Sequence, residues 1–275
     1  MSPDPLDLLH GGAEHVIGSY VLDTDDGPAL FDCGPTTCVA ALKAGLRTRG
    51  LDLQDVRHLL LSHIHLDHAG AAGVLVREHP ELQVHVSAVG APHLVDPSRL
   101  EASARRLYGE AFDDLWGELA PVPEENVRIV GDRVLGLACF PTTGHASHHV
   151  SYVDDAGTLY AGDAAGVRIQ PHSTVLPPTP PPEFDLDAWL GTLDEIERRA
   201  PTQLALIHFG VADDVGRHLD ELRRRLREWV ALEGVTEQGF TETVSRDVDE
   251  SYERAMPFWQ SYAGLKRYWE KRSDA

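Results

Sequence analysis

The stretch LLLSHIHLDHAG, residues 59–70, runs from three leucines directly into three histidines and an aspartate. A short apolar run of this kind is typical of a strand that is buried on both faces. Buried imidazole and carboxylate groups cost free energy unless they are paired or bind a metal. The strand therefore has to end at a site that satisfies these groups, and the fold has to bring the partners to it.

Three further apolar runs end in groups of the same kind. VLGLACFPTTG ends at His145, TLYAG ends at Asp163 and LALI ends at His208. In layered α/β folds, functional groups gather on the loops beyond strand ends, so we expect the four ends to meet. Together they supply the candidate metal ligands His63, His65, Asp67, His68, His145, Asp163 and His208.

The chemistry of this ligand set predicts a pair of divalent cations. Imidazole and carboxylate ligands without thiolate suit zinc, iron or manganese at catalytic sites, and we expect zinc first. His63 and His65 point to the same side of an extended loop and can share one ion. Asp67 and His68 lie further along and can reach the second. Seven ligands over two ions leave coordination positions open to solvent, which favours a catalytic site over a structural one.

The order of elements favours an α/β layered fold. Residues 14–35 read as two strands around the turn DDGP, and a helix is expected from Thr36 or Thr37 to Gly50. More strands are expected within 127–162, and helical patterns occupy 185–200 and 215–230. Strands in mixed and consecutive groups, with helices between them and at the end, predict sheets covered by helices.

Composition limits the partners. The chain has 24 Lys and Arg against 44 Asp and Glu, a formal net charge of −20. This balance repels a phosphate backbone or an anionic membrane, so neither nucleic acid nor a membrane is the expected partner. Three cysteines make a poor disulfide framework, MSPDPLDLL lacks the features of a signal peptide, and no apolar run suffices for a membrane helix. We expect a cytoplasmic protein with a small-molecule substrate.

The motifs are also recognisable as a set. SHIHLDHAG, TTGHASHHVSYV, YAGDA and LIHFG resemble, in this order, the metal motifs of the metallo-β-lactamase-fold hydrolase superfamily. The resemblance covers roughly residues 14–210 and implies a four-layer αββα sandwich with the metals at one edge between the sheets. On this basis residues 1–235 form the hydrolase domain, with 98–118 as a helical flap or insertion. Residues 236–275 form a helical C-terminal extension packed on the same domain.

The resemblance implies two ligand sets joined by one carboxylate. The first metal would be held by three histidines, His63, His65 and His145. The second would be held by Asp67, His68 and His208, with Asp163 as the bridge. His149 matches a histidine that supports the third ligand in this family. His148 occupies a place often taken by glycine, which is a departure at the local turn.

The implied chemistry is hydrolysis. Two cations that share a solvent molecule lower its pKa towards neutrality and provide a metal-bound hydroxide. One metal would polarise the substrate carbonyl, and Asp67 could orient the hydroxide and shuttle a proton to the leaving group. We therefore expect a binuclear metal-dependent hydrolase that acts on a small ester, thioester or lactone.

Several subclasses share these motifs. The H-x-H-x-D-H-A-G run is similar to that of glyoxalase II and the lactonases, but the sequence around LIHFG differs, so no member is assigned. The alternative function is a mononuclear non-haem iron oxidoreductase of the persulfide dioxygenase type. That chemistry uses two histidines and one aspartate, whereas this sequence keeps the full second ligand set. A non-catalytic binding module is disfavoured because no ligand is missing.

Substrate specificity is expected from three segments. These are the flap 98–118, the loop that carries Arg168, His172 and the proline-rich residues 177–182, and the aromatic tail from 252 to 269. Arg168 and His172 are the candidate substrate contacts. For the tail, core packing or a homodimer seam is expected.

Overall fold

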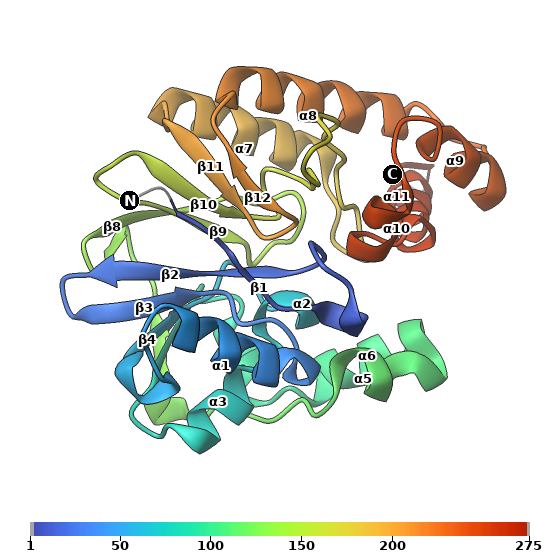
Figure 1. The fold of residues 1–275 in the computed structure, drawn as a ribbon. Helices are drawn as coiled ribbons and strands as arrows, with labels where there is room; N and C mark the ends of the chain where they lie inside the picture. Colours follow the sequence, from blue (N-terminus) through green and yellow to red (C-terminus); the bar gives the residue numbers. More distant parts are fainter. Residues whose placement is uncertain (1–2, 274–275) are drawn as a thin grey trace.

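Two sheets face each other in the computed structural model, which describes residues 3–273 (Figure 1). The first sheet has the order β1-β2-β3-β4-β5-β6. Its strands are β1 Leu6–Asp7, β2 Gly18–Thr24, β3 Gly27–Phe31, β4 His58–Leu60, β5 Gln83–Val86 and β6 Val127–Ile129. Strand β4 pairs in parallel with β3 and with β5, so it is flanked on both edges as well as buried on both faces. This position explains its continuous apolar run.

The second sheet contributes the other ligand-bearing strands. Its order is β12-β11-β10-β9-β8-β7. The strands are β7 Arg133–Val134, β8 Leu137–Pro141, β9 Val150–Val153, β10 Thr158–Gly162, β11 Gln203–Leu206 and β12 Gly210–Ala212. Only the pair β10–β11 is parallel in this sheet, so both sheets are mixed.

Helices cover both outer faces, which confirms the four-layer αββα sandwich (Figure 1). The helices up to the flap are α1 Val39–Thr48, α2 Leu66–Ala69, α3 Ala72–Glu78, α4 Ala91–Val95, α5 Ser98–Tyr108 and α6 Phe112–Trp116. The later helices are α7 Leu186–Arg199, α8 Val215–Val230, α9 Glu237–Val244, α10 Glu250–Ala255 and α11 Phe258–Ser273. Short 3₁₀ turns occur at 10–12, 36–38, 53–55, 109–111 and 124–126. Helices α1 and α3 lie on the first sheet, and α7 and α8 lie on the second.

Two tyrosines join the sheets at the edge where the ligands follow. The Tyr20 hydroxyl donates to the Leu206 carbonyl oxygen at 2.8 Å, and the Tyr152 hydroxyl donates to the Leu61 carbonyl oxygen at 2.9 Å. Both tyrosines are fully buried. Since Leu61 and Leu206 each lie two residues before a candidate metal ligand, these bonds set the spacing of the two sheets at the site.

The C-terminal helices pack on the same body. Phe240, Tyr252 and Leu265 are fully buried members of the main hydrophobic core, and the Trp269 Nε1 donates to the Val230 carbonyl oxygen at 2.9 Å. The expected ranges 1–235 and 236–275 include residues 1–2 and 274–275, which lie outside the described residues. Among residues 3–273, no helix combines the length and apolar character that crossing a membrane requires.

Stability is expected to depend on pH through His218 of α8. Its Nε2 donates to the Ala165 carbonyl oxygen at 2.7 Å, and burial lowers the pKa of the imidazole to about 4. In the unfolded chain a histidine titrates near about 6.5. The contribution of neutral His218 is therefore complete above the unfolded value and is lost as the pH falls towards the folded one. Linkage gives a loss of about 2 kcal/mol by roughly pH 5.

The substitution His218→Gln tests this expectation, because glutamine has an N–H donor and does not titrate. Denaturant unfolding at about pH 7.5 and about pH 5 should show a smaller loss of unfolding free energy in the variant than in the wild type. An equal loss in both proteins would remove His218 as a source of acid sensitivity.

Candidate metal centre

All seven expected ligands meet at the edge between the two sheets. Three groups have ligand atoms within 4.8 Å of one another: His63, His65 and His145; Asp67, His68 and His208; and His63, His68 and Asp163. The ligands follow strands β4, β8, β10 and β11, which belong to both sheets. The sheet packing therefore assembles residues that are far apart in the chain.

Three ring nitrogens face one another in the first group. His65 Nδ1 lies 2.8 Å from His63 Nε2 and 2.9 Å from His145 Nε2. One nitrogen of a neutral imidazole carries at most one proton, so His65 Nδ1 cannot donate to both neighbours. Three nitrogen lone pairs aimed at a common point are the arrangement that a divalent cation satisfies.

Asp163 lies between the first and second groups. Its Oδ2 is 3.3 Å from His145 Nε2, and its Oδ1 is 3.3 Å from His68 Nε2 and 3.5 Å from His208 Nε2. Burial opposes ionisation, but the imidazoles of His68 and His145 outweigh it and hold the pKa of Asp163 well below its usual range. One carboxylate oxygen thus faces each ligand set, as a bridge requires.

Two buried atoms in and beside the second group have no hydrogen-bond partner. Asp67 Oδ2 lies 3.4 Å from His208 Nε2 and 3.6 Å from His68 Nε2. His68 Nε2 and Asp163 Oδ1 are both buried and make no hydrogen bond. Buried polar atoms are almost always satisfied, so these two indicate a site for an ion between them.

Two backbone carbonyls fix the tautomers of two ligands. His145 Nδ1 lies 2.8 Å from the Pro178 carbonyl oxygen, and His208 Nδ1 lies 2.6 Å from the Val16 carbonyl oxygen. A carbonyl oxygen only accepts, so each Nδ1 carries the proton and donates it. In the neutral imidazole each Nε2 then keeps a lone pair that points into the cluster, which is the form that binds metal.

A buried carboxylate, that of Asp32, fixes the tautomer of His68. Asp32 Oδ2 accepts from His68 Nδ1 at 2.8 Å, and Oδ1 accepts from the Ser62 backbone N–H at 2.7 Å. The Ser62 hydroxyl adds a third bond at 2.7 Å. Asp32 and Ser62 were not among the expected site residues. The available signal was an aspartate directly after the apolar strand ALF.

The pKa shifts divide the histidines into two sets. Burial lowers the pKa of His63, His65 and His145, so these imidazoles are neutral and able to bind metal. Burial also acts on His68 and His208, but the carboxylates of Asp67 and Asp163 outweigh it and raise both pKa values. The carboxylates therefore stabilise positive charge at this position, and divalent cations would supply that charge. The residues present fit a metal centre.

His149 contacts the turn that carries Asp163. Its Nε2 accepts from the Asp163 backbone N–H at 3.1 Å, and its Nδ1 lies 2.7 Å from the Thr142 hydroxyl. His149 thus holds the backbone of Asp163 in the turn after β10. The ring centroids of His145 and His149 lie 6.0 Å apart, and the support of His145 by His149 stays a prediction.

The turn that carries His148 accommodates the larger side chain. The His148 imidazole is buried, lies 3.9 Å from Glu183 at its Nε2, and lines the cavity beside the metal ligands. Its carbonyl oxygen accepts from the Ser87 hydroxyl at 2.7 Å. An imidazole at this position thus narrows the cavity where glycine would leave it open.

Arg168 and His172 were expected to contact substrate, and the structure places them elsewhere. Arg168 pairs with Asp214, and His172 Nε2 lies 2.9 Å from Asp249 Oδ2. Neither side chain lines the cavity at the metal ligands. The expectation is corrected because acidic partners in later segments hold both groups away from it.

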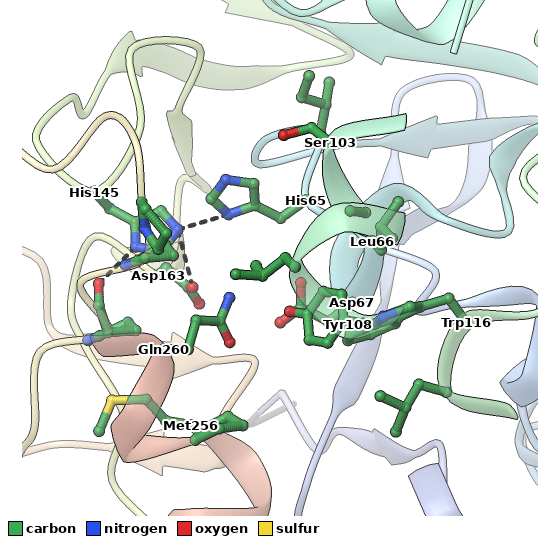
Figure 2. A pocket seen from close by; sticks show the side chains of 18 of the residues that line it. His65, Leu66, Asp67, Ser103, Tyr108, Trp116, His145, Asp163, Met256 and Gln260 are labelled. Carbon is green, nitrogen blue, oxygen red and sulfur yellow. Dashed lines mark hydrogen bonds and ion pairs between the residues drawn. The ribbon is translucent and has the colours of Figure 1, made fainter. Parts of the chain in front are cut away.

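The cavity of about 330 Å³ opens directly onto the ligands. Its walls come from the flap, the proline-rich segment 177–182, the end of α10 and the start of α11. Figure 2 shows Tyr108 and Trp116 on the Asp67 side, with Gln260 and Met256 projecting from the C-terminal part. The Tyr108 and Trp259 rings are 5.9 Å apart, so the flap and tail meet over the site.

The αββα sandwich and its interfacial histidine and aspartate cluster define a protein of the metallo-hydrolase class. The family model for the metallo-beta-lactamase superfamily matches residues 15–210, and the chain belongs to that superfamily. The Lactamase-like protein adaB of Aspergillus niger is 30% identical over 54% of this chain and 44% of its own length. The chain therefore spans about half the length of the curated relatives it matches.

Solved structures show the same fold. The archaeal metallo-beta-lactamase superfamily protein ST1585 from Sulfolobus tokodaii has a TM-score of 0.70 at 21% identity, with 93% of each chain covered. TTHA1623, solved in a di-iron-bound form, has a TM-score of 0.58 at 24% identity. That match covers 75% of this chain and 93% of the other.

Proposed function

We propose that the protein is a binuclear metal-dependent hydrolase of a small ester, thioester or lactone. The observation that carries the proposal is the position of Asp163, with one oxygen near the first ligand set and the other near the second. A bridging carboxylate next to an accessible cavity supports two ions with positions open to substrate. Zinc is the proposed metal, with iron or manganese as alternatives, because the ligand set lacks thiolate.

When bound, such ions supply Lewis-acid polarisation of a carbonyl and a water of lowered pKa. Asp67 is the residue placed to move a proton. Its side chain is 25% exposed and lines the cavity, while Oδ2 stays within 3.4 Å of His208 Nε2. A carboxylate that faces both the ligands and the substrate space can orient water and pass a proton to the leaving group.

The cavity walls support a substrate with an apolar part. Leu100, Leu107, Trp116, Met256 and Pro257 all line it. The two arginines on the lining, Arg99 and Arg254, have exposed side chains. Mostly apolar walls around a few polar groups are typical of small-molecule sites, and the net charge of −20 opposes polyanions.

The flap is expected to set substrate preference and not metal content. Trp116 packs on Tyr108 with ring centroids 5.1 Å apart and stacks on His10 at 5.4 Å. Trp116→Ala should raise KM for substrates with an apolar acyl group by roughly tenfold, since about 1–3 kcal/mol of burial is lost. The ratio of kcat/KM for a longer and a shorter acyl ester measures this, with metal content as the control. Lost metal with an unchanged ratio would make the flap structural.

A hydrolysis screen of the metal-loaded protein tests the proposal. Elemental analysis should give close to two transition-metal ions per chain, and small esters, thioesters or lactones should be cleaved. One iron per chain with thiol-dependent oxygen uptake would replace the proposal with an oxidoreductase. Cleavage of duplex DNA or tRNA in preference to every small substrate would also overturn it.

A further inference from the structure

A proline-rich segment lies between the metal ligand His145 and the C-terminal helix α11. Five of the six residues in PPTPPP, 177–182, are proline, so Thr179 alone has a backbone N–H. Proline cannot donate to a sheet or helix ladder. This segment can therefore be held in place only by packing, by Thr179 and by donors that come from other parts of the chain.

One side of the segment faces the metal centre. The Pro178 carbonyl oxygen accepts from His145 Nδ1 at 2.8 Å, which fixes the ligand tautomer. Glu183, next to the segment, accepts from the Ser147 backbone N–H at 2.8 Å and from the Ser147 hydroxyl at 2.7 Å. The loop that carries His145 thus takes its position from residues 178–183.

The other side of the segment rests on α11. The Thr179 hydroxyl donates to the Ser261 carbonyl oxygen at 3.0 Å, and both residues are buried. The Lys271 ammonium donates to the Pro182 carbonyl oxygen at 2.7 Å. These bonds supply, from the helix, the anchoring that the proline residues cannot provide themselves.

Gly264 makes the contact between the two backbones direct. A Cβ at this position would overlap the Thr179 carbonyl oxygen and would lie 2.7 Å from the Pro180 carbonyl carbon. Neither neighbour is the end of a flexible side chain, so the helix or the segment would have to move. The segment is therefore pressed against α11 without any space between them.

We propose that α11 is a positioning element of the metal centre, which acts on His145 through Gly264, Thr179 and the Pro178 carbonyl. This proposal rests on the metal site of the proposed function. The family match ends at residue 210, so α11 lies outside it.

The proposal predicts a selective effect. If Pro178 shifts, the His145 Nδ1–H loses the carbonyl oxygen that accepts from it, and the ring can turn or change tautomer. The first ligand set should then bind its ion less tightly. The second set is held by other groups, since Asp32 orients His68 and the Val16 carbonyl orients His208. Only one of the two ions should then bind less tightly.

Gly264→Ala is the principal test, with Gly191→Ala as its matched control. Gly191 is also a helical glycine, in α7, and a Cβ there meets no atom within 4 Å. Competition with a chromogenic chelator gives the Kd of each zinc ion in the protein. For Gly264→Ala, one Kd should rise about tenfold, the usual lower range for partners of metal ligands, and the other should not change. Gly191→Ala should leave both values at wild type.

Thr179→Val provides a second test in case Gly264→Ala prevents folding. Valine keeps the shape and removes the donor to Ser261, so the same Kd should rise, and Thr179→Ser should restore it. If both Gly264→Ala and Thr179→Val bind both ions as the wild type does, the proposal is wrong. If the wild type binds a single ion, the proposed binuclear function is wrong. The positioning role of α11 is then supported if these variants raise the Kd of that ion, and it is wrong if they do not.

Discussion

Replacing Asp163 with alanine is expected to abolish hydrolysis and to weaken the binding of at least one metal ion. The side chain is 4% exposed, and its two oxygens face different ligand sets at 3.3 Å from His145 and His68. Loss of a bridging ligand removes several kcal/mol of transition-state stabilisation, which corresponds to a fall in kcat of roughly 10³-fold or more. The fold should persist because the two sheets have their own hydrophobic core.

The variant Asp155→Ala provides the matched control. Asp155 lies in the turn between β9 and β10, and its side chain is 96% exposed. Asp155→Ala should keep wild-type turnover and metal content. Asp163→Ala should lose turnover and at least part of its metal, with an unchanged circular dichroism spectrum. Wild-type turnover in Asp163→Ala would show that this carboxylate does not bridge the ions.

The cluster of candidate ligands could be predicted from the sequence because its signals are local. His63, His65, Asp67 and His68 follow one buried strand within six positions, and the apolar run before them marks the strand. The strands and helices around them were also readable, since alternation and helical spacing are set by which face is buried. These local patterns predicted an α/β layered fold, and the resemblance of the metal motifs implied the four-layer sandwich.

The residues that orient the ligands could not be predicted in this way. Asp32 meets His68 across 36 positions, and the Pro178 carbonyl meets His145 across 33. A backbone carbonyl has no signature in sequence, because every residue has one. The error at Arg168 has the same origin, since its partner Asp214 lies 46 positions away. Such pairings arise only when the sheets and helices pack.

The arrangement of the cavity walls could not be predicted from the sequence either. The flap and the tail were recognised as helical, but their contact over the site depends on Tyr108 and Trp259 meeting across the molecule. Short elements such as β1, α4 and β12, of two to five residues, also lacked a readable period. Tertiary packing decides their conformation, and a single sequence does not contain that information in local form.

Asp32→Asn should weaken metal binding by about 10–100-fold, the range found when partners of metal ligands are lost. Asparagine keeps the volume of the buried side chain but replaces one acceptor oxygen with an N–H₂ group. In one orientation the amide N–H₂ faces His68 Nδ1–H, and in the other it faces the Ser62 backbone N–H. Either orientation sets a donor against a donor in a buried position.

The conflict can be relieved at His68 by moving its proton from Nδ1 to Nε2. That tautomer puts a hydrogen where the metal has to bind, so the second ligand set fails although no ligand has been removed. Hydrolysis should fall with metal affinity and should recover partly at high metal concentration, because excess ion drives the tautomer back. Asp163→Ala should show no such recovery, since its ligand is absent.

Asp26→Asn is the matched control for this prediction. Asp26 Oδ2 also pairs with a histidine, His58, at 3.1 Å, but neither residue belongs to the ligand groups. Its substitution should leave both Kd values and turnover at wild type. If Asp32→Asn also bound both ions normally, then His68 would not depend on Asp32 for its tautomer, and the buried carboxylate would serve only to hold Ser62 and the end of β4.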